Sequence, residues 1–445
     1  MLNPDTIAAI ATAHGQGGIG VIRVSGASAP AIAQALLGRL PKHKEATLST
    51  FRDAQGMSID NGIALYFHKP NSFTGEDVLE LQGHGGMAVL QLTLQRVIEL
   101  GARLAQPGEF TQRAFFNNKL DLAQAESVAD LIAATTEQGA RSAMRSLQGA
   151  FSQVINDMMA GLTQLRMLVE ASMDFPEENL DEADIVSRDR ALQSLQQQLS
   201  KTLSLAQQGS LLREGAQIVL VGRPNVGKSS LLNRLSEQDV ALVSQTPGTT
   251  RDLIRQVIQI EGVPLHIIDT AGLRESQDEV EIMGMARTRD ALKNADAVLV
   301  VVDASLGITP EDTEILKGVP DKIARIYVFN KIDLLAQLSH TTQTGEINHI
   351  YISAKTGAGI ALLQQKLLTL VGWHPESGVY MARKRHINAL LLAQNHLKRA
   401  SAENIRVEIY AEELRLAQDA LGTIVGKLSS DDLLGEIFSR FCIGK

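Results

Sequence analysis

The stretch Gly222-Arg-Pro-Asn-Val-Gly-Lys-Ser-Ser230 decides the fold, because it has the spacing of a phosphate-binding loop. The apolar run 217–221 before it predicts a short buried strand, and residues 230–235 after it predict a helix. Glycines let such a loop aim backbone N–H groups at phosphate oxygens, and the following helix adds its positive amino-terminal end. Lys228 would neutralise charge on the β- and γ-phosphates, and Ser229 would hold Mg²⁺. Taken alone, the stretch could also be a glycine-rich turn without a ligand.

The surrounding residues, from about 213 to 371, alternate between strand and helix patterns. We expect strands at 217–221, 255–260, 264–268, 297–303, 325–329 and 349–352. Such alternation is typical of a doubly wound, mostly parallel sheet. Ligands of these sheets bind at the carboxyl ends of the strands.

Three further motifs fall at those strand ends. Asp269-Thr-Ala-Gly272 is placed to reach Mg²⁺ and to sense the γ-phosphate. In Asn330-Lys-Ile-Asp333 the carboxylate can accept both N–H groups that guanine presents, whereas adenine would leave it unpaired. Ser353-Ala-Lys355 would back the base, and Thr246-Pro-Gly-Thr-Thr-Arg-Asp252 is a loop that could close on Mg²⁺. The order and spacing predict a guanine-nucleotide-binding domain.

The GTP site predicted from these motifs comprises Asn225, Val226, Gly227, Lys228, Ser229, Ser230, Ser244, Gln245, Thr246, Pro247, Gly248, Thr249, Thr250, Asp269, Thr270, Ala271, Gly272, Asn330, Lys331, Asp333, Ser353, Ala354 and Lys355.

Hydrolysis needs an explanation, because Leu273 stands where Ras-like proteins carry the glutamine that orients the attacking water. The segment 274–281 offers carboxylates instead. No arginine is an obvious transition-state finger. A monovalent cation held by Asn225 and by carbonyls of the loop 244–250 is one way to supply the charge.

Composition narrows the class of protein. The chain has 445 residues, a formal net charge of −8 and 4% aromatic residues, which is not the composition of a protein that coats nucleic acid nonspecifically. Its only cysteine is Cys442, so no intrachain disulfide can form. We expect no signal peptide and no membrane-spanning segment, because the first residues lack a basic region and no apolar run approaches 20 residues. A cytoplasmic location is the simplest expectation.

The flanks of the nucleotide domain differ from it. Residues 1–118 predict a small α+β domain, with strands at 19–24, 62–67 and 77–81 and a helix at 88–100. The glycines at 15–20 resemble a dinucleotide loop only loosely, because no clear strand leads in and no helix follows at once. Arg23, Glu80 and His84 lie in strand or turn contexts, where a surface role is the ordinary interpretation.

Helical periodicity marks residues 119–172, 187–209, 388–400, 411–427 and 433–441. We therefore expect one helical domain built from 119–212 and 373–445, with the nucleotide domain 213–372 inserted into it. The basic run Arg383-Lys-Arg-His386 is a candidate RNA contact, with a solvated helix start as the alternative.

Several stretches together resemble the bacterial tRNA-modification GTPase family MnmE (TrmE), over nearly the whole chain. The nucleotide motifs are shared by many GTPases. The more specific stretches are Gly17-Gly-Ile-Gly-Val-Ile-Arg-Val-Ser-Gly26, Pro107-Gly-Glu-Phe-Thr-Gln-Arg-Ala-Phe115, Asn118-Lys-Leu-Asp-Leu-Ala-Gln-Ala-Glu126 and Cys442-Ile-Gly-Lys445.

The resemblance implies a multidomain α/β protein: an N-terminal α+β domain that binds folate and dimerises, a discontinuous all-α domain and an inserted Ras-like G domain. It implies K⁺-activated GTP hydrolysis within an enzyme that installs a carboxymethylaminomethyl or aminomethyl group on C5 of the wobble uridine of certain tRNAs. The one-carbon unit would come from tetrahydrofolate in its 5-formyl or 5,10-methylene form. The partners implied are a second copy of the chain, the FAD-dependent protein MnmG (GidA) in a heterotetramer or larger complex, and tRNA.

The resemblance also implies roles for individual residues. Folate would be bound by Arg23, Glu80, Lys119 and Lys445. Mg²⁺ would be held by Ser229 and Thr250, and K⁺ by Asn225, Ser244, Thr246 and Thr249. Glu281 would orient the attacking water through a second water, Lys228 would assist catalysis, and Cys442 is a further catalytic candidate.

Two other functions remain open from sequence. One is a ribosome-assembly GTPase that binds rRNA as a switch and modifies nothing. Relatives of that kind usually carry a basic RNA-binding module, which we do not find in this sequence. The other is a GTP-gated scaffold whose folate site is regulatory.

Overall fold

The structure, a computed structural model, describes residues 5–13, 15–174, 182–238, 255–269, 292–320, 322–344, 347–374, 378–402, 406–427 and 431–444. The chain forms two compact units. The first comprises Met1–Ala129, Ser146–Leu195 and Leu392–Lys445, and the second Asp130–Arg145 and Gln196–Leu391.

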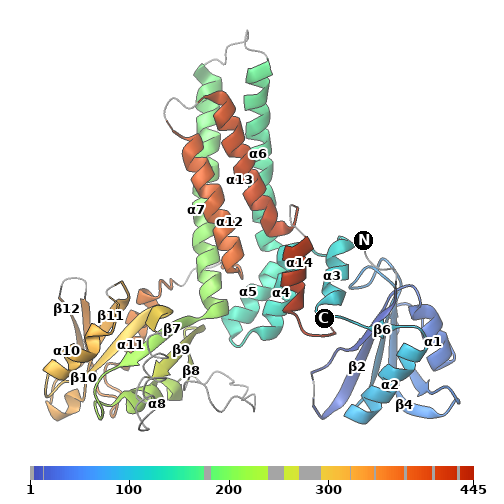
Figure 1. Ribbon diagram of the computed structural model, residues 1–445, viewed down its shortest axis with the longest axis horizontal. Coiled ribbons are helices and arrows are strands. Elements are labelled where there is room, and N and C mark those ends of the chain that lie inside the picture. The colour runs from blue at the N-terminus through green and yellow to red at the C-terminus, as the bar shows by residue number, and fades with distance from the viewer. Residues whose placement is uncertain are drawn as a thin grey trace. The chain divides into compact units, whose positions relative to one another are not determined.

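An N-terminal sheet of six strands organises the start of the first unit (Figure 1). Its strands are β1 (Ile7–Ile10), β2 (Gly17–Ser25), β3 (Thr47–Arg52), β4 (Ser58–Phe67), β5 (Val78–Gly85) and β6 (Arg103–Leu104), in the order β3-β4-β5-β2-β1-β6. Only the β1–β6 pair is parallel. The helices of this domain are α1 (Ala29–Leu37), α2 (Met87–Glu99) and α3 (Glu109–Phe116).

The helices α1 and α2 bury one face of this sheet. Ile22 and Leu81 point to that face and pack against Leu90 of α2. Because side chains alternate along a strand, Arg23 and Glu80, one residue away from Ile22 and Leu81, belong to the opposite face. They are direct partners across the antiparallel pair β2–β5.

The helical segments are α4 (Leu122–Ala133), α5 (Glu137–Leu147), α6 (Ala150–Asp174), α7 (Glu182–Glu214), α12 (Lys384–Ala400), α13 (Val407–Val425) and α14 (Asp431–Ser439). Within the first unit, α13 packs along α6 (Figure 1). Gln418 fixes the register: it accepts a hydrogen bond from Arg166 at 3.0 Å and donates to Thr163 at 2.9 Å. The helix α14 buries Phe438 against Leu122 of α4.

The second unit contains a seven-stranded sheet in the order β12-β13-β11-β10-β7-β9-β8. Its strands are β7 (Ala216–Val221), β8 (Arg255–Ile260), β9 (Val263–Asp269), β10 (Ala297–Asp303), β11 (Ala324–Asn330), β12 (His340–Thr344) and β13 (Ile347–Tyr351), and the edge strands β8 and β12 are antiparallel to their neighbours. Every residue of β10 is buried, as expected of a central parallel strand covered on both faces. Among the described residues, the helical elements that alternate with these strands are α8 (Lys228–Gln238), α10 (Pro310–Lys317), the short 3₁₀ turn η2 (Ile332–Leu334) and α11 (Ile360–Leu370).

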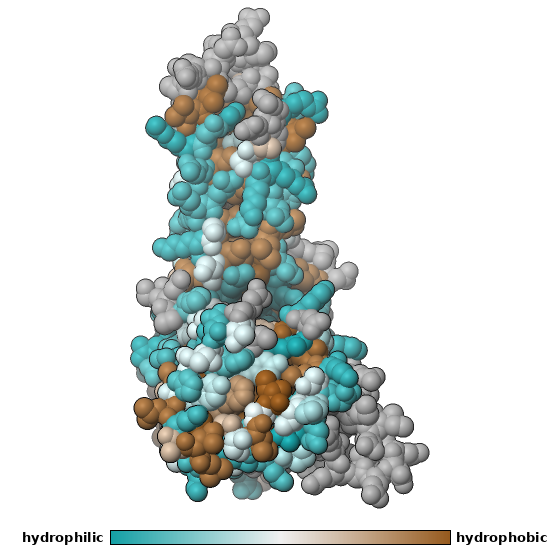
Figure 2. All heavy atoms as spheres, turned by 90° about the vertical axis from the view of Figure 1, so that its left-hand side faces the viewer, coloured by the Kyte–Doolittle hydropathy of each residue, from teal (hydrophilic) through white to brown (hydrophobic). Residues whose placement is uncertain are grey.

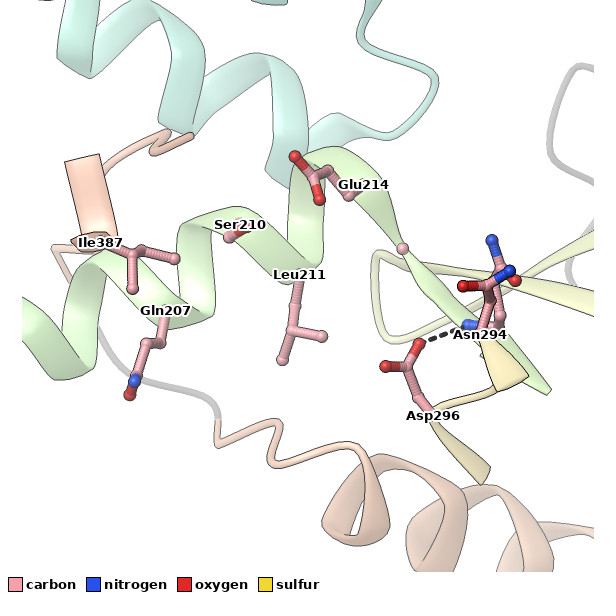
Figure 3. A pocket seen from close by; sticks show the side chains of 9 residues that line it. Gln207, Ser210, Leu211, Glu214, Asn294, Asp296 and Ile387 are labelled. Atoms are coloured by element: carbon pink, nitrogen blue, oxygen red, sulfur yellow. Dashed lines mark hydrogen bonds between the residues drawn. The ribbon is translucent and has the colours of Figure 1, made fainter. Parts of the chain in front are cut away.

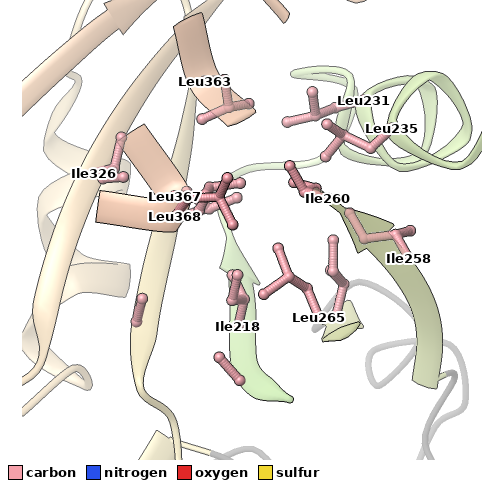
Figure 4. Close-up of a cluster of buried hydrophobic side chains, with 14 of the residues drawn as sticks. Ile218, Leu231, Leu235, Ile258, Ile260, Leu265, Ile326, Leu363, Leu367 and Leu368 are labelled. Carbon is pink, nitrogen blue, oxygen red and sulfur yellow. The ribbon is translucent and has the colours of Figure 1, made fainter. Parts of the chain in front are cut away.

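The larger core of this sheet includes residues from outside it. Ile218, Leu265 and Ile326 pack against Leu363 and Leu367 of α11 (Figure 4). Leu205 and Leu212 of α7 and Trp373 and Val379, which follow α11, belong to the same buried cluster. The segments that lead into and out of the nucleotide domain therefore share its hydrophobic core.

Polar contacts hold these two connecting segments together. Gln208 of α7 donates to the carbonyl of Gly372 at 2.7 Å and accepts from the N–H of His374 at 2.9 Å. Nearby, the buried Asp130 of α4 binds both Arg213, at 2.9 Å, and Arg383, at 2.8 Å. These contacts connect the start of the G domain with its end.

The predicted fold class is confirmed: an α+β N-terminal domain, a discontinuous helical domain and an inserted Ras-like G domain. All six predicted strands of the G domain are present within two residues of their expected ends. The sequence patterns did not predict β1, β3, β6, α1, α3 and β12. The glycine-rich segment 17–20 lies in β2, so rejecting a dinucleotide loop there was correct.

Candidate guanine-nucleotide site

The phosphate-binding loop follows β7, as the sequence predicted. Lys228, at the first position of α8, is 5% exposed, and its Nζ donates to the carbonyls of Gly222 and Arg223 at 2.7 and 2.8 Å. Asn225 has a φ of 61°, in the left-handed region that costs a residue with a side chain about 1–2 kcal/mol. The loop is thus curled around its own lysine, in a strand–loop–helix arrangement suited to phosphate.

Gly227 is required by a close approach inside this loop. Its φ is 99°, and a Cβ atom there would lie 2.2 Å from Nδ2 of Asn330. The amide of Asn330 uses that space. Its Nδ2 donates to the carbonyl of Val226 at 2.9 Å, and its Oδ1 accepts from the N–H of Ala354 at 2.9 Å. One buried side chain therefore links the phosphate loop, the guanine motif and the Ser353-Ala-Lys355 motif.

The residues expected to recognise the guanine base lie close to Asn330. Asp333 accepts a hydrogen bond from the hydroxyl of Ser353 at 2.6 Å, which orients the carboxylate and leaves it exposed. Arg234 of α8 donates to the carbonyls of Ala354 and Lys355 at 3.1 and 2.8 Å. Three of the predicted motifs are thus brought together at the carboxyl edge of one sheet.

Lys331 lies at the same edge of the sheet, and its backbone has a φ of 70°. Its side chain forms an ion pair of 2.7 Å with Asp303, the last residue of β10. Burial acts to raise the pKa of Asp303, but hydrogen bonds from Lys331 and Ser305 outweigh it, so the pKa lies below the ordinary 3.8. The carboxylate of Asp303 is therefore charged at neutral pH.

Asp269 ends β9 at the same edge and is 9% exposed. Ser229 and Ser230 are exposed at the start of α8. The other residues predicted for this site lie outside the described residues: Ser244, Gln245, Thr246, Pro247, Gly248, Thr249, Thr250, Thr270, Ala271 and Gly272, together with Glu281. Of the predicted Mg²⁺ and K⁺ ligands, the structure describes Ser229 and Asn225.

A second candidate site lies in the N-terminal domain. Arg23 donates from Nε to Glu80 at 2.9 Å, and one terminal nitrogen approaches the carbonyl of Gly444 at 3.4 Å. The two side chains are 19% and 17% exposed. The guanidinium lies 5.8 Å from the centre of the ring of Phe73 and 5.7 Å from that of Phe110. Charged and aromatic groups therefore meet next to the C-terminal tail.

The tail is fixed by its backbone. The carbonyl of Cys442 accepts from the N–H of Gly108 at 3.3 Å, while its side chain is exposed. Gly444 has a φ of 93°, and a Cβ there would lie 2.5 Å from the carbonyl oxygen of Ile10. Lys445, the next residue, lies outside the described residues.

Lys119 is exposed and donates to the carbonyl of Pro70 at 3.0 Å. Its side chain also lies close to Gly75. Lys119 thus contacts the 70–75 loop, which carries Phe73. Three of the four predicted folate residues are thus described: Arg23 and Glu80 form an ion pair, and Lys119 contacts the 70–75 loop, whose Phe73 lies beside Arg23.

Two other sequence features have structural roles. Nδ1 of His84 donates to the carboxylate of Asp60, whose side chain is 8% exposed, at 2.7 Å, and the backbone N–H of His84 donates to the same carboxylate at 2.8 Å. In the basic run, Arg383 is ion-paired with Asp130 and His386 is 2% exposed. The run does lie at the start of α12, but these two residues are neither solvated, as the alternative interpretation expected, nor exposed for an RNA contact.

A separate hollow of about 310 Å³ lies at the opposite edge of the G-domain sheet (Figure 3). Its lining residues are Gln207, Ser210, Leu211, Glu214, Gly215, Gln217, Asn294, Asp296 and Ile387. Asp296 accepts from the backbone N–H of Gln217 at 2.7 Å, at the amino end of β7. The predicted nucleotide motifs do not contribute to this hollow.

Exposed apolar side chains follow β10 and β11: Leu306, Ile308, Leu334, Leu335 and Leu338. Figure 2, viewed from the side that carries β12 and α10 in Figure 1, shows patches of apolar atoms on the surface of the G domain. In the described part of the chain, no helix is long and apolar enough to cross a membrane.

Two family models match the chain. Residues 6–119 match the GTP-binding protein TrmE N-terminus, and residues 122–442 match the MnmE helical domain. The chain belongs to the MnmE family. Relatives named tRNA modification GTPase MnmE include those of Nitrosospira multiformis, at 57% identity, and Nitrosomonas eutropha, at 54%, each over 100% of both chains. The protein from Dechloromonas aromatica, with the same name, is 53% identical over 100% of both chains.

Among solved structures, the G domain of the T. maritima FeoB iron transporter is 26% identical and covers 35% of this chain and 98% of that chain, with a TM-score of 0.25.

Proposed function

We propose that this chain hydrolyses GTP in the G domain as part of an enzyme that modifies C5 of the wobble uridine of certain tRNAs. The group installed is of the carboxymethylaminomethyl or aminomethyl type. The observation that carries the GTPase assignment is the amide of Asn330, which joins the phosphate loop to the guanine motif. Membership of the MnmE family supports the link to tRNA modification.

The chain's own residues fit a guanine nucleotide. The carboxylate of Asp333 is exposed and oriented by Ser353, so it can accept the two N–H groups of guanine. Lys228 already donates to carbonyls at the mouth of the loop, and phosphate oxygens offer it stronger acceptors. The amino end of α8 adds backbone donors for the same phosphates.

Metal ions would supply charge neutralisation during hydrolysis. We propose Ser229 and Thr250 as the Mg²⁺ ligands. The K⁺ ligands proposed are Asn225, Ser244, Thr246 and Thr249. The left-handed backbone of Asn225 leaves its side chain exposed at the phosphate loop, which fits a cation ligand. Leu273 cannot orient water, so we assign that role to Glu281.

Folate is the ligand that we propose for Arg23, Glu80, Lys119 and Lys445. A pterin ring offers both donors and acceptors to a charged pair, and the partly exposed ring of Phe73 can cover its flat face. Bound tetrahydrofolate would supply the one-carbon unit. Cys442 is exposed beside this site and remains a candidate catalytic residue.

The proposed assembly contains two copies of this chain, the FAD-carrying partner MnmG (GidA) and tRNA, in the cytoplasm. The proposed domain boundaries are 1–118, 119–212, 213–372 and 373–445. The support is the similarity of the whole chain to relatives of the MnmE family.

Steady-state GTP hydrolysis of the purified chain, in K⁺ and in Na⁺ at equal ionic strength, tests the G-domain proposal. Acceleration by K⁺ alone is expected. Equal, slow rates in both salts would instead favour a ribosome-assembly switch that awaits an external activator. Glu281→Ala should lower turnover by about 100-fold while GTP still binds, the scale of losing a positioned proton-handling group.

Binding of 5-formyltetrahydrofolate to the full chain, measured by calorimetry, tests the folate proposal separately. Glu80→Ala should abolish binding, because it leaves Arg23 without its partner. The control is Glu99→Ala, which removes an exposed carboxylate paired with Arg96 on α2. A wild-type chain without folate affinity would contradict this part of the proposal and leave the GTPase part standing.

A further inference from the structure

The connection between β10 and α10, residues 303–312, carries none of the nucleotide motifs. Two of its carboxylates are nevertheless buried: Asp303 is 8% exposed and Asp312 is 2% exposed. Each one binds a basic side chain that belongs to a nucleotide motif. A buried carboxylate is costly without such partners, so these contacts define the conformation of the connection.

Asp303 acts on the guanine motif. Its Oδ2 binds Nζ of Lys331 at 2.7 Å, while Oδ1 accepts from the N–H and hydroxyl of Ser305 at 3.0 and 2.6 Å. Asp303 is also the register partner of Asn330 at the ends of the parallel strands β10 and β11. Ser305 holds Oδ1, so the carboxylate is oriented independently of Lys331, which binds the other oxygen.

Lys331 needs such support because its backbone is strained. A φ of 70° places it in the left-handed region, which is unfavourable for a residue with a side chain. Its side chain is 32% exposed, whereas that of Asp303 is 11% exposed. The ion pair therefore holds a strained, half-exposed lysine against a rigid strand end.

Asp312 acts on the phosphate loop. Its Oδ2 accepts from the N–H and hydroxyl of Thr309 in the capping box of α10, at 3.0 and 2.8 Å. Its Oδ1 accepts from Nε of Arg223, the second residue of the loop, at 3.1 Å. The carbonyl of Arg223 in turn accepts from Lys228 at 2.8 Å. A continuous chain of contacts thus runs from the helix cap to the phosphate-binding lysine.

We propose that Asp303 and Asp312 are positioning residues for the bound guanine nucleotide, acting through Lys331 and Arg223. The inference rests on the guanine-nucleotide site of the proposed function. It adds two residues that lie outside the nucleotide motifs and position residues within them. Neither carboxylate is placed in contact with the nucleotide, because both are occupied by protein donors. Asp303 serves the base side of the site and Asp312 the phosphate side.

The test compares Asp303→Asn and Asp312→Asn in the full chain, by titration with fluorescent GDP and by GTP turnover at saturation. For Asp303→Asn we expect the Kd for GDP to rise about tenfold, the scale of one lost charge-assisted hydrogen bond, with kcat within about twofold. Asp312→Asn should raise the Kd and also lower kcat, since the proposed function places Lys228 on the β- and γ-phosphates. The control is Glu314→Gln, because Glu314 is exposed on α10 and forms its ion pair, within the described part of the chain, with Lys317 of the same helix.

Double variants separate positioning from general stability. If Asp303 acts through Lys331, Asp303→Asn should raise the Kd by less than about twofold in a Lys331→Met background. Full additivity of the two effects would overturn the proposal for that pair. Should Asp312→Asn fail to fold, Arg223→Met breaks the same pair from the other side and keeps the cap formed by Asp312 and Thr309.

The outcomes also separate this inference from the proposed function. A wild-type chain that does not bind GDP would contradict the nucleotide site itself. A wild-type chain that binds GDP, with unchanged Kd values in Asp303→Asn and Arg223→Met, would contradict only the positioning role. A loss of thermal stability without a change in Kd would count against it in the same way.

Discussion

The side-chain amide of Asn330 donates to the backbone carbonyl of Val226 over 2.9 Å, across 104 residues of sequence. The guanine motif and the phosphate loop are therefore joined by a direct hydrogen bond. The oxygen of the same amide, Oδ1, accepts a hydrogen bond from the backbone N–H of Ala354. Nucleotide affinity and the stability of the G domain should consequently depend on the same side chain.

Asn330→Ala should lower the free energy of unfolding of the G domain by about 3 kcal/mol, because each buried polar group left without a partner costs about 1–3 kcal/mol. The Kd for GDP should rise in parallel. Urea unfolding followed by the fluorescence of the single tryptophan, Trp373, reports on this unit, since Trp373 lies in its core. Asn388→Ala, at an exposed position of α12, is the control and should leave both quantities unchanged.

Gly227→Ala should abolish GDP binding, because the added methyl group would lie 2.2 Å from Nδ2 of Asn330 and φ is positive. Gly307 offers a matched comparison: its φ is 66°, but a Cβ there would meet no atom within 4 Å. Gly307→Ala should therefore cost only about 1 kcal/mol of backbone strain and retain GDP binding. Equal affinities of the two variants would contradict the close approach at Gly227.

Gly444→Ala should weaken binding of 5-formyltetrahydrofolate by at least about tenfold, equivalent to 1.4 kcal/mol, by displacing the tail from Arg23. The reason is steric, since the new Cβ would lie 2.5 Å from the carbonyl of Ile10. Gly435→Ala places a methyl group in open space on α14 and serves as the control. Calorimetry on both variants decides whether the tail position matters for this ligand.

The N-terminal domain should lose stability in acid through the ion network around Arg113. This side chain is 1% exposed and binds Asp5, Glu76 and Glu109. The Arg103 hydrogen bond is the main cause that lowers the pKa of Asp5, whereas for Glu109 burial opposes the lowering by Arg103 and Arg113. Both pKa values lie below the ordinary 3.8 and 4.5.

The network therefore contributes its full stabilisation above the ordinary pKa values and loses it as the pH falls through the lower, folded ones. Hydrogen exchange of amides in β1 and α3 of the full chain should show protection decreasing below about pH 4. Arg113→Met should weaken this pH dependence, which Arg103 maintains in part through Asp5 and Glu109, and destabilise the domain by about 3–5 kcal/mol, as breaking a buried ion pair does. If the loss of protection in acid is unchanged in Arg113→Met, it arises from carboxylates outside this network.

The sequence predicted the G domain well because its signals are local. Strands such as β10 are continuous apolar runs, and each motif lies within a few residues of a strand end. The edge strand β12, His340–Thr344, is fully exposed and polar, so no hydrophobic pattern marks it. Similarly, β3 has an exposed Leu48 and a buried Ser49, which reverses the expected alternation.

The supports of the site could not be predicted, because they depend on contacts between distant segments. Nothing near Asp312 in sequence indicates that it binds Arg223, 89 residues away. The pairing of Arg23 with Glu80 requires the β2–β5 register, and only the family resemblance selected these two residues. The assigned roles of Glu281, Thr250 and Lys445, and the proposed domain boundaries, remain predictions.

The pairing of α6 with α13 constrains how this chain can be made. A ribosome completes the whole of the G domain after it has finished α6 and before it begins α13, the helix that covers α6. The apolar residues Leu162 and Leu165 of α6 are buried in the finished domain, yet more than 200 residues, from Asp174 to Val407, must be synthesised after α6 before α13 begins. Nascent chains stalled before residue 407 should consequently bind chaperones that recognise exposed apolar helices, although their G domain is already folded and able to hold GTP.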